Sequence, residues 1–328
     1  MARITEAPPP EVVADIEVLK AALDDTVPAK RLDHNLLVAT WNLRAFGGLT
    51  EEWHAGPDDS PRRDLHSLLA IAEIVSRFDV VALQEVRGNL KALRHMLKAL
   101  GSDWSFILTD VTRGAAGNDE RMAFVFDTRR VKPSGLAAEL VLPPEWHGQA
   151  IADSAATRQF ARTPYAVSFA STGRGYQRTF ILVTLHVLYG SSASERTGEL
   201  KAIAEWLAAE ARDVNAYDHN LIALGDFNID RKDDPNYQAF VSTGLRVPAE
   251  LHDLPRTIFP GEGSERHYDQ VAWFTGESGA PALSIRYAGR GGHVDFVGRV
   301  LADHDLDRQS LSWKISDHYP LWVEFLVQ

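Results

Sequence analysis

From residue 35 onward the chain alternates between short apolar runs and polar stretches. The apolar runs are rich in β-branched residues and have the length of strands. They cover residues 36–42, 79–85, 104–110, 122–127, 165–169, 179–187, 220–228, 268–274, 293–298 and 320–327. We predict a strand in each of these segments.

Three segments between the apolar runs repeat apolar residues at the spacing of one helix face. The residues of the three stripes are Leu65, Leu68, Leu69, Ala72 and Val75, then Leu90, Leu93, Leu97 and Leu100, and then Leu200, Ile203 and Leu207. Many strands with a few interspersed helices favour an α/β (α+β) fold, a four-layer α/β/β/α sandwich of two packed mixed sheets with outer helices. Strict alternation of strand and helix is missing, which argues against a barrel.

The first 34 residues have a different character from the rest. They begin with a Pro-rich segment, continue into one amphipathic helix near Glu11 to Leu23, and end in a charged linker. We predict an N-terminal extension with one helix over residues 1–34, followed by one domain over residues 35–328.

Three long segments are rich in glycine, proline and charge, and could border a functional site. Plain surface loops explain them equally well. They are Gly47 to Pro61, Arg113 to Glu120 and Pro143 to Pro164.

Composition limits the classes of function. The 45 acidic and 34 basic residues give a net charge of -11, so any contact with a polyanion must be locally basic. Arginines that could form such a rim are Arg44, Arg62, Arg63, Arg87, Arg113, Arg121 and Arg162. The absence of cysteine removes disulfides, thiolate metal sites and cysteine nucleophiles. Without a signal-peptide pattern or a transmembrane segment, we expect a soluble, cytoplasmic protein.

Polar residues stand at the ends of four predicted strands: Asn42, Glu85, His186 and Asp226. A rigid sheet holds side chains at such positions, where they can face a common cleft. Asn42, Glu85, Asp226 and Asn228 also offer the amide and carboxylate oxygens that a hard cation such as Mg²⁺ prefers. Any one of them alone would be explained as a turn or surface residue.

Five motifs together are more specific than any of these residues. They are TWNLR from Thr40, DVVALQEVR from Asp79, LGDFN from Leu224, YDQVAW from Tyr268 and SDHYPL from Ser316. In this order they resemble the motifs of the endonuclease/exonuclease/phosphatase superfamily, and deoxyribonuclease I and its bacterial relatives in particular. The resemblance spans roughly residues 35–328 and implies a deoxyribonuclease I-like fold and a metal-dependent phosphoric ester hydrolase.

The resemblance also implies roles for individual residues. Catalytic positions are His186, Asp226, Asn228, Asp269 and His318, metal-binding positions are Asn42, Glu85 and Asp317, and phosphate-binding positions are Arg87 and Arg121. Asp269 would hydrogen-bond His318, which would act as general base with Asp226 as the alternative. Gln270 departs from the pattern, because deoxyribonuclease-like members often carry Arg there.

Two further groups of residues are candidates for the site. Arg162 resembles a recurrent family motif before a strand, although it could equally be a surface residue. His293 and Asp295 alternate at two-residue spacing, for which a half-buried strand is the better explanation.

We therefore expect hydrolysis of phosphodiester bonds with Mg²⁺, or alternatively Mn²⁺, as cofactor, and DNA or RNA as substrate. A phosphatase or phosphodiesterase for small-molecule or lipid headgroup phosphates is the alternative, because one fold serves many substrates. A catalytically silent binding module is a minor third reading. The sequence gives no reason to expect an obligate protein partner.

Overall fold

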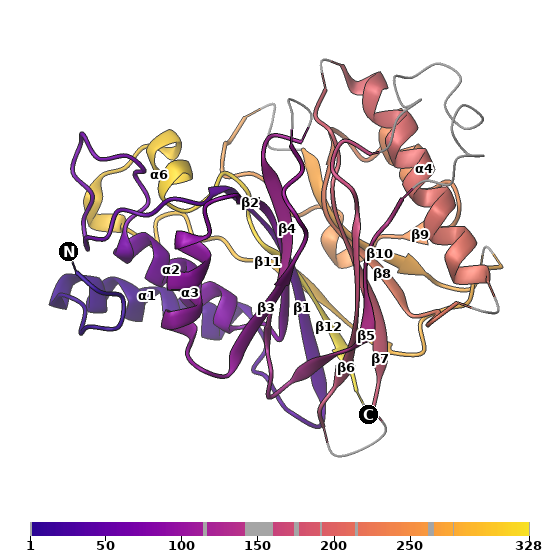
Figure 1. Cartoon of the computed structure of the whole chain (residues 1–328), viewed down its shortest axis with the longest axis horizontal. Coiled ribbons are helices and arrows are strands. Elements are labelled where there is room, and N and C mark those ends of the chain that lie inside the picture. Colours follow the sequence, from indigo (N-terminus) through magenta and orange to yellow (C-terminus); the bar gives the residue numbers. More distant parts are fainter. Residues whose placement is uncertain are drawn as a thin grey trace.

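The computed structural model describes residues 2–113, 117–141, 160–173, 177–190, 192–213, 216–261, 266–277 and 279–327. Two mixed six-stranded sheets pack face to face (Figure 1). The first has the order β11 (Arg286–His293), β12 (Leu321–Leu326), β1 (Asn35–Phe46), β2 (Val80–Arg87), β4 (Glu120–Asp127) and β3 (Trp104–Leu108). The second has the order β5 (Val131–Glu139), β6 (Tyr165–Ser171), β7 (Thr179–His186), β8 (Leu221–Ile229), β10 (His267–Phe274) and β9 (Leu245–Arg246).

Helices cover the outer faces of both sheets (Figure 1). Beside the first sheet lie α1 (Pro10–Thr26), α2 (Leu65–Ser76), α3 (Lys91–Leu100) and α6 (Arg308–Lys314). Beside the second lie α4 (Ala193–Arg212) and α5 (Pro235–Val241). Two short 3-10 helices are η2 (Ala249–Leu251) and η3 (Ala302–His304). The predicted four-layer α/β/β/α sandwich is confirmed.

Each sheet has one parallel strand pair at its centre. In the first sheet β1 and β2 are parallel and α2 connects them, and in the second β7 and β8 are parallel and α4 connects them. The neighbouring strands pair antiparallel. Because both members of a parallel pair end at the same edge of the sheet, polar side chains at their carboxyl ends lie close together.

The apolar runs in the central strands are continuous because both of their faces are buried. In β1, Leu36 and Val38 face the core between the sheets, whereas Leu37 and Ala39 face the helices. The inter-sheet core includes Phe124 of β4, whose ring packs edge to face on Phe169 with centroids 5.6 Å apart. This packing joins the two sheets across their inner faces.

The N-terminal helix packs on the helical layer outside the first sheet. Its buried residues Val12, Ile16, Leu19 and Leu23 join the hydrophobic cluster that contains α2 and α3. The helix predicted near Glu11 to Leu23 is thus present, and the division into an extension and a domain stays a prediction. No helix within the described ranges is long and apolar enough to cross a bilayer.

The strand predicted over residues 293–298 is wrong. β11 ends at His293, and the Asp295 side chain then accepts a hydrogen bond from the backbone of Val297, which turns the chain. The real strand was hidden by its composition, RYAGRGGH. Gly292 is required there, since a Cβ atom would stand 2.7 Å from the Trp322 ring.

Other elements were missed because they lack an apolar period. β5 is largely exposed and contains Pro133 and Gly135, while β9, α5 and α6 are too short to show a stripe. Most of the predicted loop Pro143 to Pro164 lies outside the described residues, as do residues 114–116 of the segment Arg113 to Glu120.

Candidate active site

Asn42 and Glu85 stand at irregular ends of β1 and β2. The register of β1 on β2 shifts after Asn42, and that of β2 on β4 shifts after Leu83. Ala45 and Glu85 adopt left-handed backbone conformations, with φ of 49° and 59°. The bulges bring the Ala45 amide to Glu85, where it donates to Oε2 at 2.8 Å. Strained backbone is thus used to aim one carboxylate.

Arg63 holds this strained segment in place. Its guanidinium donates to the carbonyls of Arg44, Ala45, Lys314 and Ile315 at 2.9 to 3.3 Å, and the residue is 2 % exposed. Burial lowers the pKa of Arg63 to about 10, which leaves it charged at neutral pH, and Glu85 and Asp317 favour that charge. Arg63 therefore supports the site from beneath, and its donors are occupied by the backbone.

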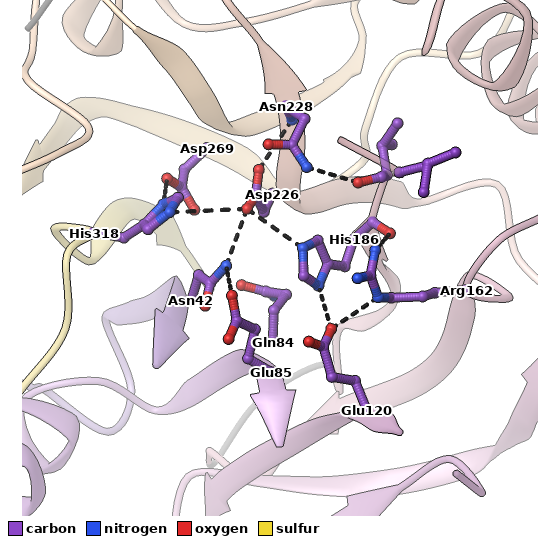
Figure 2. A network of polar contacts seen from close by, with 12 residues as sticks. Asn42, Gln84, Glu85, Glu120, Arg162, His186, Asp226, Asn228, Asp269 and His318 are labelled. Atoms are coloured by element: carbon purple, nitrogen blue, oxygen red, sulfur yellow. Dashed lines mark hydrogen bonds and ion pairs between the residues drawn. The ribbon is translucent and has the colours of Figure 1, made fainter. Parts of the chain in front are cut away.

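Asp226, near the end of β8, contacts residues from both sheets (Figure 2). Asn42 donates from Nδ2 to Asp226 Oδ2 at 3.0 Å and to Glu85 Oε1 at 3.2 Å. His186 Nε2 and His318 Nε2 approach the same Asp226 oxygen at 3.7 and 4.0 Å. The structure thus brings together five of the residues predicted from the sequence.

The carboxyl groups of this cluster are held in the charged form. Burial alone would raise the pKa of Asp226, but His318, His186 and hydrogen bonds from Asn228 and Asn42 lower it below its ordinary value. Burial also acts to raise the pKa of Glu85, and the two histidines with the Ala45 amide reverse that effect. Both side chains therefore carry negative charge into a buried site.

The residues of this cluster fit a hard divalent cation. Two ionised carboxylates converge on Asn42, whose Oδ1 atom is buried without a hydrogen-bond partner among the described residues. An unpaired amide oxygen beside two carboxylates is the donor set that Mg²⁺ prefers.

The motif LGDFN departs from regular strand geometry at Gly225 and Asn228. Asn228 is left-handed, with φ of 49°, so the chain does not stay extended from Asp226 to Asn228. The Asn228 amide donates to Asp226 Oδ1 at 2.9 Å, and its side chain donates to the Val187 carbonyl at 2.7 Å. Gly225 precedes them with φ of 143°, and a Cβ atom there would lie 2.1 Å from the Leu185 carbonyl oxygen.

Asp269 and His318 form a buried pair. The Asp269 carboxylate lies 2.6 Å from His318 Nδ1, as predicted, and this leaves Nε2 facing Asp226. Burial raises the pKa of Asp269 to about 6. Burial would lower the pKa of His318, but Asp269, Asp226 and Asp317 raise it well above its usual value.

The pair is surrounded by groups that fix its position. Trp41 donates to the His318 carbonyl at 2.8 Å, and the fully buried Arg256 donates to the Asp269 carbonyl at 2.9 Å. Gln270, which departs from the motif that the sequence resembles, is buried and donates to the His267 carbonyl at 2.6 Å. Arg256 also donates to the carbonyls of Leu254 and Leu251, and it could not be identified from the sequence because it belongs to none of the five motifs.

His186 is held by a carboxylate that sequence reasoning missed. Glu120, at the start of β4, places Oε2 at 3.1 Å from His186 Nδ1 and at 2.8 Å from Arg162 Nε (Figure 2). Its other oxygen lies 3.4 Å from Arg87 Nη2, and Arg87 also reaches within 3.7 Å of Glu85. In the sequence Glu120 only opens the string ERMAFVF, and nothing in that pattern indicates its contacts with His186 and Arg162.

Two predicted residues lie outside this network of contacts. Asp317 pairs with Arg44 at 3.6 Å, and its Oδ1 atom has no hydrogen-bond partner within the described part of the chain. Arg121 donates to the Gly88 carbonyl at 3.2 Å and lies 4.0 Å from Asp110. Neither metal binding by Asp317 nor phosphate binding by Arg121 is visible in these contacts, and both roles stay predictions.

The chain is similar to proteins of one known family over most of its length. The model of the Endonuclease/Exonuclease/phosphatase family matches residues 39–318, which include every residue of the cluster. A protein named Deoxyribonuclease from Thioalkalivibrio sp. (strain K90mix) is 26% identical over 300 residues, which are 89% of this chain and 71% of that protein.

Solved structures share the fold at low identity. A functionally unknown conserved protein from Enterococcus faecalis V583 has a TM-score of 0.57 at 16% identity, covering 88% of this chain and 99% of the other. Mannosyl-6-phosphatase from Bacteroides thetaiotaomicron VPI-5482 has a TM-score of 0.52 at 20% identity, covering 88% and 99%. D. rerio TDP2 complexed with single strand DNA product has a TM-score of 0.53 at 16% identity, covering 89% and 98%.

Proposed function

Because the chain belongs to the endonuclease/exonuclease/phosphatase family, we propose that it hydrolyses phosphodiester bonds in DNA with a divalent cation, Mg²⁺ in the first place, as cofactor. The observation that carries this proposal is the convergence of Asn42, His186 and His318 on Asp226, with Glu85 hydrogen-bonded to the same Asn42. Enzymes of the family generally depend on a divalent metal. Glu85 and Asn42 would hold the ion, which would supply charge neutralisation on the phosphoryl oxygens.

The chain's own residues would carry the rest of the reaction. A water oxygen attacks phosphorus, the bond to the leaving oxygen breaks, and the water proton passes to a base. Asp226 Oδ2 and His318 Nε2, which lie 4.0 Å apart, are the two atoms that could accept this proton. Three carboxylates favour the protonated form of His318, so we assign the proton to Asp226 and the binding of a phosphate oxygen to His318.

His186 and Asn228 stand on the other side of Asp226 and would contact the remaining phosphate oxygens. His186 is fixed from behind by Glu120, which leaves Nε2 directed at the cluster. Donors that are already in place when the negative charge grows stabilise the transition state most effectively.

Support for DNA comes from the cationic groups that flank Glu85. Arg87 lies on one side, 3.7 Å from its carboxylate. On the other side, Arg44 stacks 3.9 Å from the Trp313 ring centroid and lines a cavity of about 410 Å³ with Arg62. A guanidinium beside an exposed aromatic ring suits a phosphate and a base of a nucleic acid strand. The related Deoxyribonuclease supports the same substrate.

The test is plasmid nicking with Mg²⁺ or Mn²⁺, with and without a chelator, for the wild type, Glu85→Gln and His318→Asn. We expect both variants and the chelated enzyme to lose at least ~100-fold in rate, because charge neutralisation and transition-state stabilisation are removed. The matched controls Glu205→Gln and His219→Asn lie away from the cluster and should keep the wild-type rate.

The other readings give different results in the same experiment. If the wild type nicks no DNA with any divalent ion but releases phosphate from sugar phosphates, the substrate is a small phosphoester and the DNA proposal fails. If neither substrate class is hydrolysed, or if both variants hydrolyse as fast as the wild type, the chemistry does not take place at this cluster, and a binding role gains support.

A further inference from the structure

Three histidines gather outside the first sheet, on residues that the phosphoesterase site does not use. His54 belongs to the segment between β1 and α2, His66 is the second residue of α2, and His304 ends η3. One ring nitrogen of each lies within 4.8 Å of those of the others. The ring centroids are 5.3 to 5.7 Å apart.

Two carboxylates of α1 hold these rings from behind. Asp15 Oδ2 lies 2.9 Å from His66 Nε2, and Glu11 Oε1 lies 3.3 Å from His54 Nε2. A carboxylate on one nitrogen of an imidazole fixes the ring and makes the other nitrogen a better ligand, which is the usual surrounding of metal-bound histidines.

His66 has a nitrogen that protein contacts leave unused. The residue is 2 % exposed, and its Nδ1 atom is buried without a hydrogen-bond partner among the residues that the structure describes. Leaving a buried polar atom unpaired is costly, so such an atom calls for a ligand. The two neighbouring imidazoles are the groups that would share that ligand.

We propose that His54, His66 and His304 bind a transition metal ion of the Zn²⁺ class, separate from the phosphoesterase centre. Imidazole nitrogens suit Zn²⁺, whereas Mg²⁺ and Ca²⁺ prefer oxygen. Bonds of ~2 Å in a tetrahedron place the nitrogens about 3.3 Å apart, so the cluster closes slightly around the ion. His54 and His304 are exposed and can move toward the buried His66.

The site would tie the N-terminal helix to the rest of the protein. Asp15 of α1 contacts His66 and also accepts the Leu301 amide at 2.9 Å, next to η3. The metal would therefore join the segment before α2, α2 itself and η3, all of which α1 touches through its carboxylates. An ion that binds only the folded state raises its stability by mass action.

The experiment is a Zn²⁺ titration of the full chain after removal of metal, read by calorimetry and by the melting temperature. The variants are His54→Ala/His304→Ala, the control His219→Ala, and Glu85→Gln, which separates binding at the phosphoesterase centre. We expect the double variant to lose one equivalent of Zn²⁺ and a Zn²⁺-dependent rise in Tm of at least about 3 °C. His219→Ala and Glu85→Gln should keep both.

If the double variant binds as many equivalents of Zn²⁺ as the wild type and shows the same Zn²⁺-dependent rise in Tm, the proposal is overturned. So would loss of that equivalent in Glu85→Gln alone, which would assign the ion to the phosphoesterase centre. The exposed side chains changed in the double variant leave His66 and its bond to Asp15 in place, and circular dichroism checks the fold. Because binding is read without substrate, failure here is distinct from failure to cleave DNA.

Discussion

At the residue scale, the site depends on how charge is distributed around His318. Asp269 is bonded to one nitrogen of the ring, while Asp226 faces the other. The buried aspartate fixes the ring's orientation and stabilises its positive charge, as a carboxylate does for any buried imidazole. Replacing a single atom of this pair should therefore change the rate of hydrolysis.

Asp269→Asn replaces one carboxylate oxygen with an amide and keeps the shape. We expect hydrolysis to fall by about 100-fold or more, with little change in KM, because His318 loses its charged partner and its fixed orientation. Steady-state kinetics on a short DNA substrate measures both constants. Asp295→Asn, which changes an aspartate at the end of β11, is the control; an equal fall there would indicate a general effect on folding.

A variant of Arg44 tests whether the site binds DNA, separately from the hydrolytic step. In Arg44→Gln we expect KM for DNA to rise several-fold, kcat to change little, and the salt dependence of binding to weaken by roughly one counterion. Arg246 of β9 is exposed and paired with Glu277, so Arg246→Gln provides the control. Unchanged KM and salt dependence in Arg44→Gln would remove the Arg44 and Trp313 cavity from the DNA path.

At the element scale, the central parallel pair of β7 and β8 requires a close backbone approach at Gly225. Gly225→Ala would place Cβ against the Leu185 carbonyl and force a residue with a side chain to adopt φ near 143°. We expect a loss of more than about 2 kcal/mol in the free energy of unfolding, measured by urea denaturation. In Gly88→Ala the added Cβ meets no atom within 4 Å, so that variant should stay close to the wild type.

The central strands could be predicted from their continuous apolar runs, and the four helices α1 to α4 from the spacing of their apolar residues. Strand-end residues such as Asn42, Glu85 and Asp226 could be identified for the same reason, since an apolar run that stops at a polar residue marks an end of the sheet. β11 could not, because its glycines fit against Trp322. Glu120 could not, because its role comes from Arg162 and His186, which lie far away in the sequence.

At the scale of the whole molecule, an ion pair joins the segment between α1 and β1 to the first sheet. Lys30 lies 3.1 Å from Asp127, which also receives the side chain and amide of Arg129 at 2.8 to 3.0 Å. Burial would raise the pKa of Asp127, but Arg129 and Lys30 lower it to about 2. The ordinary aspartate value is about 3.9.

This shift fixes the sign of a pH effect. Because the folded-state pKa is lowered, the stabilisation is present above pH ~4 and is lost as the pH falls toward about 2. The difference in unfolding free energy between the wild type and Asp127→Asn should therefore be larger at pH 6 than at pH 3. Urea denaturation at both values measures it, and a difference that stays constant or grows at pH 3 would contradict the assignment.

The hydrogen bond from Asn42 to Asp226 joins a strand of one sheet to a strand of the other. The 3.0 Å between these atoms depends on how the two sheets pack, and side chains such as Phe124 and Phe169 form the apolar layer between the sheets. We therefore expect the rate of hydrolysis to depend on the distance between the two sheets. A substitution that thins or loosens that layer far from any polar group would slow hydrolysis well before the protein unfolds, so a screen for activity would also select for packing density.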